Sequence, residues 1–487
     1  MGRARVVGRA VSAMELHVSL SRRDELTVEI YRQVRQAILE GRLRAGERLP
    51  PTRELARRLS VSRTTVTLAY DQLAHEGYVA ARVGAGTFVS DHVQAFGSRV
   101  RSAVGALRPR PVWATIPVPA RLERQVEFDF RVGIPDAGLF PYARWRRLLA
   151  GELDAAAGGL GVYADPAGHQ GLRQAIARHL GVARGVRASG DDVVVTSGTQ
   201  QAVDLVARVL LAPGDQVAVE DPGYGPPRRL LASLGARVAG VPVDMQGVVV
   251  DAIPPGTRLV YVTPSHQFPL GVTMSPARRL ALLAWARRQD AAIVEDDYDS
   301  EFRYSGRPIE PLQAMDTSGR VVYVGSFSKT MLPSLRLGYV VAPSSLRHAL
   351  RAAKFATDWH TPLPTQAALA RFIDEGWFAG HVRRMRAVYQ ERHRLVVDGL
   401  RRRFVEHLEV IPSAAGVHVT ATACGLSAGQ LGELVRRASA AGVEVQPLSM
   451  YGAAAPGPPG LVVGYGAIPA ERIAAGLHCL RRCLDGR

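Results

Sequence analysis

Near the N-terminus, the pattern of apolar and polar positions predicts three helices followed by two short strands. Residues 26–40 carry apolar side chains at helical spacing, and a glycine directly after them predicts the helix end. Two prolines precede a second helix at 53–59, and a short turn separates it from a third helix at 63–76. Strands are predicted at 78–83 and 87–89. This order of elements is typical of a winged helix-turn-helix.

The third predicted helix has an apolar face and a polar first turn. Its buried face is predicted to consist of four residues at helical spacing: Val66, Ala69, Tyr70 and Leu73. Its first turn offers Ser62, Arg63, Thr64 and Thr65, and recognition helices read DNA with their N-terminal residues. In an isolated helix, the same turn would be better explained as a solvated cap, with Ser62 as the N-cap.

Beyond the hairpin, the pattern changes twice. Residues 91–127 have little periodicity and several prolines, which predicts a linker that is stiff where proline is frequent. From Phe128 onward, short apolar runs alternate with helical patterns such as 202–211 and 275–289. The predicted strands are 191–196, 216–220, 258–263, 291–295 and 320–324. Strands that alternate with helices indicate a mainly parallel sheet with helices on both faces.

The predicted strands end in residues that can contact a ligand, and ligands of such sheets bind beyond the carboxyl ends of the strands. After the first strand, Gly198 and Thr199 open a helix, whose free N–H groups and dipole favour a phosphate. Tyr224 lies on a rigid turn after the second strand, where its ring can stack on a planar group. Asp296 and Tyr298 follow the fourth strand. Their convergence on one edge indicates a binding site, although each motif alone is common.

Lys329 follows the fifth strand and stands between two hydroxyl-bearing residues. Among the 61 lysines and arginines of the chain, only Lys329 and Lys354 are lysines. A lysine that desolvation makes partly neutral is a nucleophile toward an aldehyde and can hold it as a Schiff base, which arginine cannot do. A planar aldehyde cofactor that carries a phosphate would account for all of these residues. Tyr224 would then stack on its ring, and Asp296 would pair with a protonated ring nitrogen.

The phosphate of such a cofactor would be held by backbone N–H, hydroxyl and guanidinium groups. These groups belong to Gly198, Thr199, Ser326 and Arg336. Tyr298 can reach a phenolic oxygen on the ring. Taken singly, Asp296 is also compatible with a solvated loop acid, and Tyr224 with an aromatic residue of a turn.

Composition adds a charge argument. The formal net charge of +17 favours an anionic partner, with nucleic acid as the first candidate. Three cysteines, Cys424, Cys479 and Cys483, lack metal-ligand spacing, so we expect free thiols in a reducing cytoplasm and no metal site. No apolar run reaches the roughly 20 residues needed to span a bilayer. Residues 1–13 are either a basic arm or precede a true start at Met14.

The N-terminal pattern resembles a known family. The stretch LPPTRELARRLSVSRTTVTLAYDQLAHEGYV, followed by GAGTFV, is similar to the winged-helix head of GntR-family regulators. The resemblance implies a DNA-binding domain at 14–90 that contacts an operator in double-stranded DNA. It assigns DNA contacts to seven positions, the last at the wing tip: Arg53, Ser62, Arg63, Thr64, Thr65, Thr67 and Gly84.

Residues 128–487 resemble fold-type I pyridoxal-phosphate aminotransferases, and most closely the aminotransferase-like half of MocR/GabR-type regulators. The matching stretches are YADPAGHQGLRQAIA, SGTQQ, EDPGY, TPSHQFPLG, EDDYDSEFRY and SFSKTMLPSLRLGY. The resemblance implies an α/β fold with a large mainly parallel-sheet domain, a small C-terminal α+β subdomain from about residue 385, and a homodimer. It implies pyridoxal 5'-phosphate as the cofactor, contacted by Tyr224, Asp296, Tyr298, Ser326, Lys329 and Arg336. Leu270 replaces a residue that is usually small, which leaves the roles of the preceding 265–267 open.

Together, the two resemblances imply a pyridoxal-phosphate-dependent transcriptional regulator that senses the cofactor itself or a small amine or amino-acid-like effector. A working aminotransferase with a DNA-binding head, and a phosphate-binding scaffold without cofactor, are the alternatives. Enzymes of this fold usually hold the substrate carboxylate with an arginine near the C-terminus, at a position that we place at Val462. Residues 460–465 contain no cation, so we expect poor or absent transamination of α-amino acids, unless Arg336 or an arginine of the partner chain substitutes.

Overall fold

The structure of the protein is a computed structural model that describes residues 25–91, 107–118, 126–155, 161–306, 310–452 and 459–486. The chain divides into two compact units, Met1–Pro109 and Arg110–Arg487, and each is described by itself. The basic arm predicted at 1–13, and the alternative start Met14, lie outside the described residues. Among the helices described, none combines the length and the apolar character that a membrane crossing requires.

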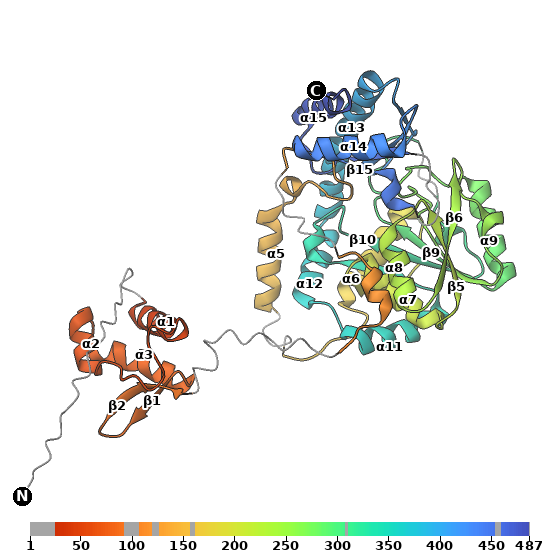
Figure 1. The fold of residues 1–487 in the computed structure, drawn as a ribbon. Coiled ribbons are helices and arrows are strands. Elements are labelled where there is room, and N and C mark those ends of the chain that lie inside the picture. Colours follow the sequence, from red (N-terminus) through yellow and green to blue (C-terminus); the bar gives the residue numbers. More distant parts are fainter. Residues whose placement is uncertain are drawn as a thin grey trace, which may run out of the picture. The chain divides into compact units, whose positions relative to one another are not determined.

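The first unit is a winged helix-turn-helix, as the sequence predicts (Figure 1). Its elements are α1 Leu26–Leu39, α2 Thr52–Leu59, α3 Arg63–His75, β1 Val79–Arg82 and β2 Gly86–Val89. One apolar cluster joins the three helices to the antiparallel hairpin through residues such as Ile30, Leu55, Val66 and Leu73. The helices are thereby held so that the first turn of α3 and the hairpin tip stay exposed.

The second unit begins with a short 3₁₀ helix, η2 Pro111–Thr115, whose preceding Arg110 donates through Nη2 to the carbonyl oxygen of Ser233 at 2.9 Å. Its helices are α5 Tyr142–Ala155, α6 Gln170–Arg184, α7 Thr199–Leu210, α8 Gly225–Ser233, α9 Pro276–Gln289, α10 Leu312–Met315, α11 Arg347–Asp358, α12 Leu363–Asp374, α13 Trp377–Arg403, α14 Ala428–Ala440 and α15 Ala470–Leu484. The predicted linker of 91–127 is therefore helical and packed at 111–115, while 92–106 and 119–125 lie outside the described residues.

An eight-stranded sheet forms the centre of this unit, in the order β4-β11-β10-β9-β8-β5-β6-β7. Its strands are β4 Val193–Thr196, β5 Gln216–Asp221, β6 Arg237–Asp244, β7 Gly247–Val248, β8 Thr257–Val262, β9 Ala292–Asp297, β10 Val321–Ser326 and β11 Gly338–Val341. β11 is antiparallel to both of its neighbours, and β7 is antiparallel to β6, so the rest of the sheet is parallel. The prediction of a mainly parallel sheet is confirmed.

Helices cover both faces of the sheet, as Figure 1 shows for α7 and α8 on one side and α9 on the other. Successive strand residues point to opposite faces, so Val194 packs in the cluster that contains α7 and α11, whereas Val193 and Val195 pack with α6 and α12. α9 covers the second face further along, beside Val260. A strand buried on both faces reads as a continuous apolar run, which is why these strands were recognisable from the sequence.

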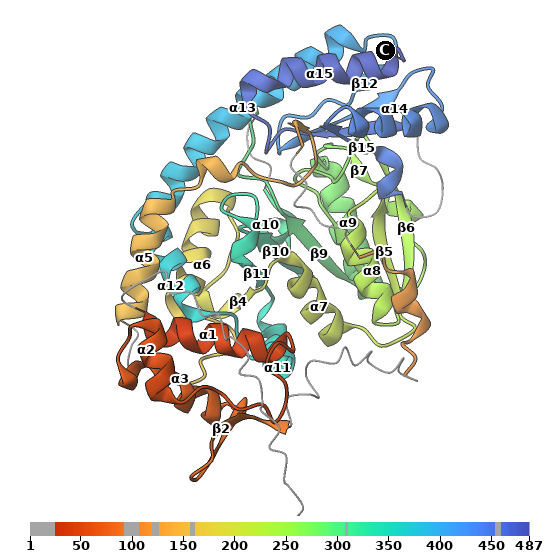
Figure 2. The ribbon, with the colours of Figure 1, turned by 60° about the vertical axis from the view of Figure 1, so that its left-hand side comes forward.

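A second, smaller sheet has its own core near the C-terminus, where α13, α14 and α15 gather in Figure 2. Its antiparallel strands lie in the order β12-β13-β16-β15, and a separate pair joins β14 to β3 in parallel. The bounds are β3 Phe128–Asp129, β12 Leu408–Val410, β13 His418–Ala423, β14 Val443–Glu444, β15 Gln446–Pro447 and β16 Gly460–Gly464. This is the small α+β part that the family resemblance implies.

Candidate functional site

The carboxyl ends of β4, β5, β8, β9 and β10 lie on one edge of the large sheet, because these strands run parallel in one sheet. The predicted cofactor residues are all carried by these strand ends or by the segments that follow them. Two of them belong to the strands themselves, since β9 includes Asp296 and β10 includes Ser326.

Lys329 lies in the segment after β10, and its side chain reaches across to the chain near residue 133. Its Nζ donates to the carbonyl oxygen of Gly133 at 2.6 Å. Burial lowers the pKa of Lys329, although the carboxylates of Asp299 and Asp296 oppose the shift. A lowered pKa increases the fraction of neutral amine, which is the form that attacks an aldehyde. Gly133 has a φ of +82°, and a Cβ atom there would stand 3.2 Å from Nζ, so a larger residue would crowd the lysine.

Asp296 is a buried carboxyl group that lacks a full set of partners. Its Oδ2 accepts a hydrogen bond from the hydroxyl of Tyr261, while its Oδ1 has no hydrogen-bond partner among the described residues. Burial raises the pKa of Asp296 to about 7, and the neighbouring Asp297 and Asp299 add to the rise, against the effects of Tyr261 and Lys329. A buried acceptor without a partner is costly, and a cationic N–H donor from a ligand would satisfy it. This atom fits the protonated ring nitrogen of pyridoxal phosphate.

The loop between β4 and α7 can hold a phosphate. Gly198 stands directly before α7 with a φ of +81°, and the 12-residue helix directs its first free N–H groups toward this loop. Arg336 donates through Nη2 to the carbonyl oxygen of Ser197 at 2.6 Å, and a Cβ at Gly198 would stand 2.9 Å from that nitrogen. Ser326 is near the same turn, because its partner in the β10–β11 ladder is Gly338, whose added Cβ would stand 2.8 Å from the Cα of Gly198.

The second lysine, Lys354, is connected to this loop through hydrogen bonds, a role that the sequence did not indicate. Lys354 is buried in α11, and its Nζ lies 2.6 Å from Oδ1 of Asp358. Gln201 donates to the other oxygen of Asp358 at 2.8 Å, and its Oε1 accepts from the backbone N–H of Ser197 at 2.8 Å. Lys354 therefore fixes the position of the loop through a chain of polar contacts.

The two predicted tyrosines lie on either side of Phe268. The rings of Tyr224 and Tyr298 each meet the Phe268 ring edge to face, at centroid distances of 5.5 and 6.1 Å. Tyr224 is 38% exposed as a residue, so part of it remains accessible to a ligand. The Tyr298 hydroxyl lies 3.0 Å from both Nδ1 and the carbonyl oxygen of His266.

The structure assigns partners to the segment 265–267, whose role the sequence left open. His266 is buried, with Nδ1 at 3.0 Å from Oδ2 of Asp299. Gln267 donates to the carbonyl oxygen of Pro222 at 2.9 Å, which links the turn that carries Tyr224 to the loop after β8. Ser265 accepts from Nη2 of Arg184 at 2.8 Å. These residues position the site's tyrosines and acids, and only their contacts over long sequence separations reveal it.

On the first unit, the predicted DNA contacts lie at the start of α2, at the cap and in the first half of α3, and at the hairpin tip. Arg53, Arg63, Thr64 and Gly84 are exposed, and Thr67 is half-buried. Ser62 caps α3 by accepting from the backbone N–H of Thr65 at 3.0 Å, and the two hydroxyls lie 2.8 Å apart. Both readings of this turn therefore apply: it caps the helix, and it exposes a guanidinium and hydroxyl groups. Gly84 has a φ of +75° and open space around it, as a tight wing tip requires.

Val462 lies in β16, where it is fully buried between Thr420 on β13 and Gln446 on β15. The β16 strand carries no cation, in agreement with the sequence. Gln446 accepts from the backbone N–H of Val132 at 3.0 Å and from the hydroxyl of Tyr451 at 2.9 Å. A neutral amide and apolar side chains occupy the place where a carboxylate-binding arginine was sought.

The chain combines an N-terminal winged helix-turn-helix with an aminotransferase fold, which is the arrangement of a class of transcriptional regulators. Residues 129–456 match the family Aminotransferase class I and II, and residues 26–89 match the Bacterial regulatory proteins, gntR family. The chain belongs to the MocR-type transcriptional regulators, which combine these two parts. It is 39% identical to the probable rhizopine catabolism regulatory protein MocR of Rhizobium meliloti, over 93% of this chain and 92% of that protein.

Two further comparisons, one with a regulator and one with an enzyme, are consistent with this assignment. The chain is 31% identical to the pyridoxine biosynthesis transcriptional regulator PdxR of Corynebacterium glutamicum, over 91% of this chain and 92% of that one. Among solved structures, the kynurenine aminotransferase of Pyrococcus horikoshii superposes with a TM-score of 0.69 at 27% identity, covering 75% of this chain and 92% of that chain. The relatives that span nearly the whole chain are named regulators, whereas the enzyme matches only part of it.

Proposed function

We propose that this regulator binds pyridoxal 5'-phosphate through Lys329 and that the bound cofactor controls its binding to operator DNA. The observation that carries the proposal is the buried Oδ1 of Asp296, which has no partner among the described residues and lies in the same site as the amine of Lys329, whose pKa burial lowers. The unpaired carboxyl oxygen, the amine and the phosphate loop match the ring nitrogen, the aldehyde and the phosphate of this cofactor.

Each residue has a distinct part in this proposal. When bound, pyridoxal phosphate supplies an aldehyde that reacts with amines and a ring that withdraws electrons. Lys329 holds the aldehyde carbon, and Asp296 accepts from the ring nitrogen. Tyr224 covers one ring face, and Tyr298 donates to the phenolic oxygen. The phosphate is held by Gly198, Thr199, Ser326 and Arg336.

We infer a sensor rather than an enzyme, acting in the cytoplasm as a homodimer on double-stranded DNA. The named functions of the full-length relatives support the regulatory role. The effector is the cofactor itself, or a small amine that reacts with it. The deciding experiment is a footprint on the DNA upstream of the protein's own gene, with and without pyridoxal phosphate. We expect the protected region or its affinity to change with the cofactor, and an identical footprint in both conditions would contradict cofactor control.

Asp296→Asn is expected to stabilise the cofactor-free protein while weakening cofactor binding. In the unfolded chain an aspartate titrates near pH ~4, whereas the folded pKa is about 7. Ionising this group therefore opposes folding increasingly between these two values, and below them the carboxyl is neutral in both states. The gain in melting temperature should be larger at pH 8 than at pH 5. Loss of a hydrogen bond to a charged group, roughly 1.5–3 kcal/mol, should weaken the cofactor about 10–150-fold.

The two readouts of Asp296→Asn are measured by thermal melting of the cofactor-free protein and by titration with pyridoxal phosphate. An increase in melting temperature that is the same at pH 5 and pH 8 would show that the charge of Asp296 does not cause the stabilisation. Unchanged cofactor affinity would separate Asp296 from the ring nitrogen.

Arg63→Ala is expected to weaken operator binding without changing the cofactor spectrum. Arg63 is exposed at the first turn of α3, where its Nε donates to the Thr52 hydroxyl at 3.4 Å, and no acid among the described residues pairs with its guanidinium. Loss of a good base contact costs roughly 1–3 kcal/mol, or about 5–150-fold in affinity. Arg57→Ala, an exposed arginine of α2, is the matched control at the same salt concentration. Equal effects of the two substitutions would mean that Arg63 contributes only general charge.

A further inference from the structure

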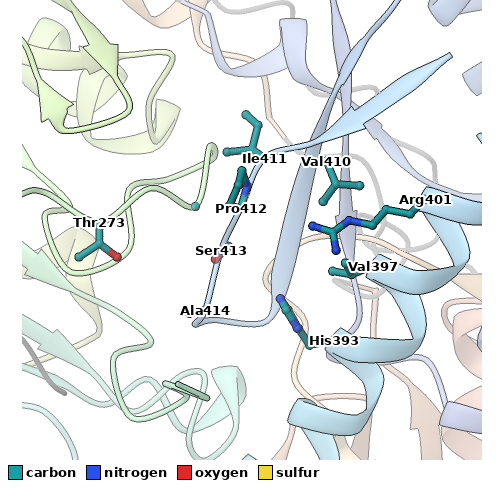
Figure 3. A pocket seen from close by; sticks show the side chains of 10 residues that line it. Thr273, His393, Val397, Arg401, Val410, Ile411, Pro412, Ser413 and Ala414 are labelled. Carbon is teal, nitrogen blue, oxygen red and sulfur yellow. The ribbon is translucent and has the colours of Figure 1, made fainter. Parts of the chain in front are cut away.

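A separate cavity of about 470 Å³ lies beside the C-terminal half of α13 (Figure 3). Its walls come from the loop after β8 at Thr273, from α13, and from the segment 410–414 that follows β12. The walls contain none of the residues proposed to hold the cofactor. The volume is within the range of roughly 300–1,000 Å³ that is usual for small-molecule sites.

One face of α13 supplies polar groups to this cavity. His393, Val397 and Arg401 are four residues apart, so they share a face of the helix, and Figure 3 shows all three side chains at the cavity. The described residues include no acid paired with Arg401, whereas the nearby Arg394 lies 3.7 Å from the carboxylate of Asp398 and Arg402 donates to the backbone carbonyl of Asp398. The guanidinium of Arg401 is therefore an available site for an anion.

His393 gives a second, independent sign of a missing partner. Its Nε2 is buried and has no hydrogen-bond partner among the described residues. Burial also lowers the pKa of His393, against the effect of a hydrogen bond with the Ser413 backbone, and the guanidinium of Arg401 adds to the lowering. A neutral imidazole in this position can exchange a hydrogen bond with a polar group of a ligand. Hydroxyl groups of Thr273 and Ser413 complete the polar lining, and valine and isoleucine side chains supply an apolar wall.

The cavity also touches the proposed cofactor site through a short chain of contacts. The Ser413 hydroxyl lies 3.2 Å from Nε2 of His266. On the other side of the same ring, Nδ1 lies 3.0 Å from Oδ2 of Asp299 and 3.0 Å from the Tyr298 hydroxyl. Two residues thus separate the cavity from a tyrosine of the cofactor site.

We propose that this cavity is a second effector site, which binds a small organic anion and is coupled to the cofactor site through Ser413, His266 and Tyr298. Arg401 pairs with the carboxylate or phosphate of the ligand, and His393 meets a second polar group. The apolar wall formed by Val397 and its neighbours receives the short carbon chain.

The coupling follows from the single proton of the Ser413 hydroxyl. Without a ligand, this proton is donated either to Nε2 of His266 at 3.2 Å or to the carbonyl oxygen of Ala415 at 3.3 Å, and in the first case the Nδ1–H of His266 donates to Asp299. When Ser413 donates to an anion instead, its oxygen becomes an acceptor that faces Nε2, which favours the tautomer with a proton on Nε2 and removes the Nδ1–H that donated to Asp299. Nδ1 then accepts from the Tyr298 hydroxyl. Tyr298 is thereby diverted from the phenolic oxygen of the cofactor.

The test uses the full chain saturated with pyridoxal phosphate and two probes that lack an amine, 2-hydroxy-4-methylpentanoate and inorganic phosphate. Neither probe can react with the cofactor aldehyde. We expect calorimetry to detect binding of at least one probe, which distinguishes a carboxylate from a phosphate site. Arg401→Met should weaken that binding at least tenfold, while Arg402→Met, its exposed neighbour, should leave it unchanged.

Coupling has its own readouts. Bound probe should shift the visible spectrum and change the cofactor affinity by about fivefold or more, and the cofactor should change the probe affinity by the same factor. Ser413→Ala should bind the probe more weakly, because one donor to the anion is lost, and should show no spectral shift even when it is saturated with probe. Absence of binding by either probe at millimolar concentration, or equal binding by Arg401→Met and the unmodified protein, would overturn the site. A spectral shift that survives Ser413→Ala would overturn the coupling. The coupling readouts rest on the proposed binding of the cofactor, but none of these outcomes depends on whether the cofactor changes the binding of the protein to DNA.

Discussion

Replacing Lys329 with alanine is expected to remove completely the visible absorption that pyridoxal phosphate gives when it is bound covalently to the protein. The absorption requires an imine with an amine in the site, and Lys329 is one of two lysines in the chain. The other, Lys354, is buried in α11 and paired with Asp358, on the far side of the phosphate loop. No second lysine can therefore take over. The measurement is an absorption spectrum of the purified variant after incubation with excess cofactor.

The matched control is Lys354→Met, which removes the other amine while keeping a side chain of similar length. Because Lys354 supports Asp358 and, through Gln201, the backbone of Ser197, we expect weaker cofactor binding but an intact absorption at saturation. Lys329→Ala should still fold, since within the described parts of the chain Lys329 makes one hydrogen bond, to Gly133. A retained absorption in Lys329→Ala would refute the covalent assignment. Its loss in Lys354→Met at saturation would indicate that Lys354, and not Lys329, holds the cofactor.

The winged helix could be predicted from the sequence because its signals are local. Ser62 caps α3 within three residues, and glycine residues stand at the turns that need a positive φ. Five of the eight strands of the large sheet were equally accessible, since they are buried and read as apolar runs, whereas β6, β7 and β11 were not predicted, and β6 is largely exposed. For two of the predicted strands, the predicted end came too early. β9 continues through Asp296 and Asp297, and β10 continues through Ser326.

Those strand ends were missed for a physical reason. A run of apolar letters stops at the first polar residue, yet Asp296 and Asp297 are buried in the strand. They are tolerated there because distant residues contact them: Tyr261 donates to Asp296, and Arg184 pairs with Asp297 at 3.0 Å. Such partners lie tens of residues away, so only the folded chain shows that a polar residue can continue a buried strand.

The same limit applies to the site. The candidate ligand contacts could be proposed from the sequence because they follow strands in recognisable motifs, as Lys329 and Tyr224 do. The residues that position them could not, because the contacts span long separations, such as Gly133 with Lys329 or Ser413 with His266. Lys354 illustrates the difference, since nothing in its local sequence shows that its charge supports the phosphate loop.

The absence of an arginine at Val462 leads to the second large effect that we expect. Three arginines near the site have partners: Arg131 makes a two-pronged contact with Asp129, at 2.8 and 2.6 Å, Arg184 pairs with Asp297 at 3.0 Å, and Arg336 donates to Ser197. An amino-acid carboxylate would therefore enter beside the buried Val462 and the neutral amide of Gln446. Leaving a buried charge without its partner costs roughly 3–5 kcal/mol, which corresponds to about 10²–10⁴-fold in rate relative to a site that has the arginine.

We accordingly expect α-amino acids to convert the cofactor-loaded protein to the pyridoxamine form very slowly or not at all. The measurement follows the visible absorption of the loaded protein during titration with the common amino acids. L-norvaline and butylamine form a matched pair, because they differ by the carboxylate alone. An aminotransferase with its arginine should strongly prefer norvaline, whereas this protein should bind the two with similar affinity or favour the amine, since the carboxylate gains no cation and loses its water. Rapid conversion by any common amino acid would defeat this prediction and would make an active aminotransferase the better description of the protein.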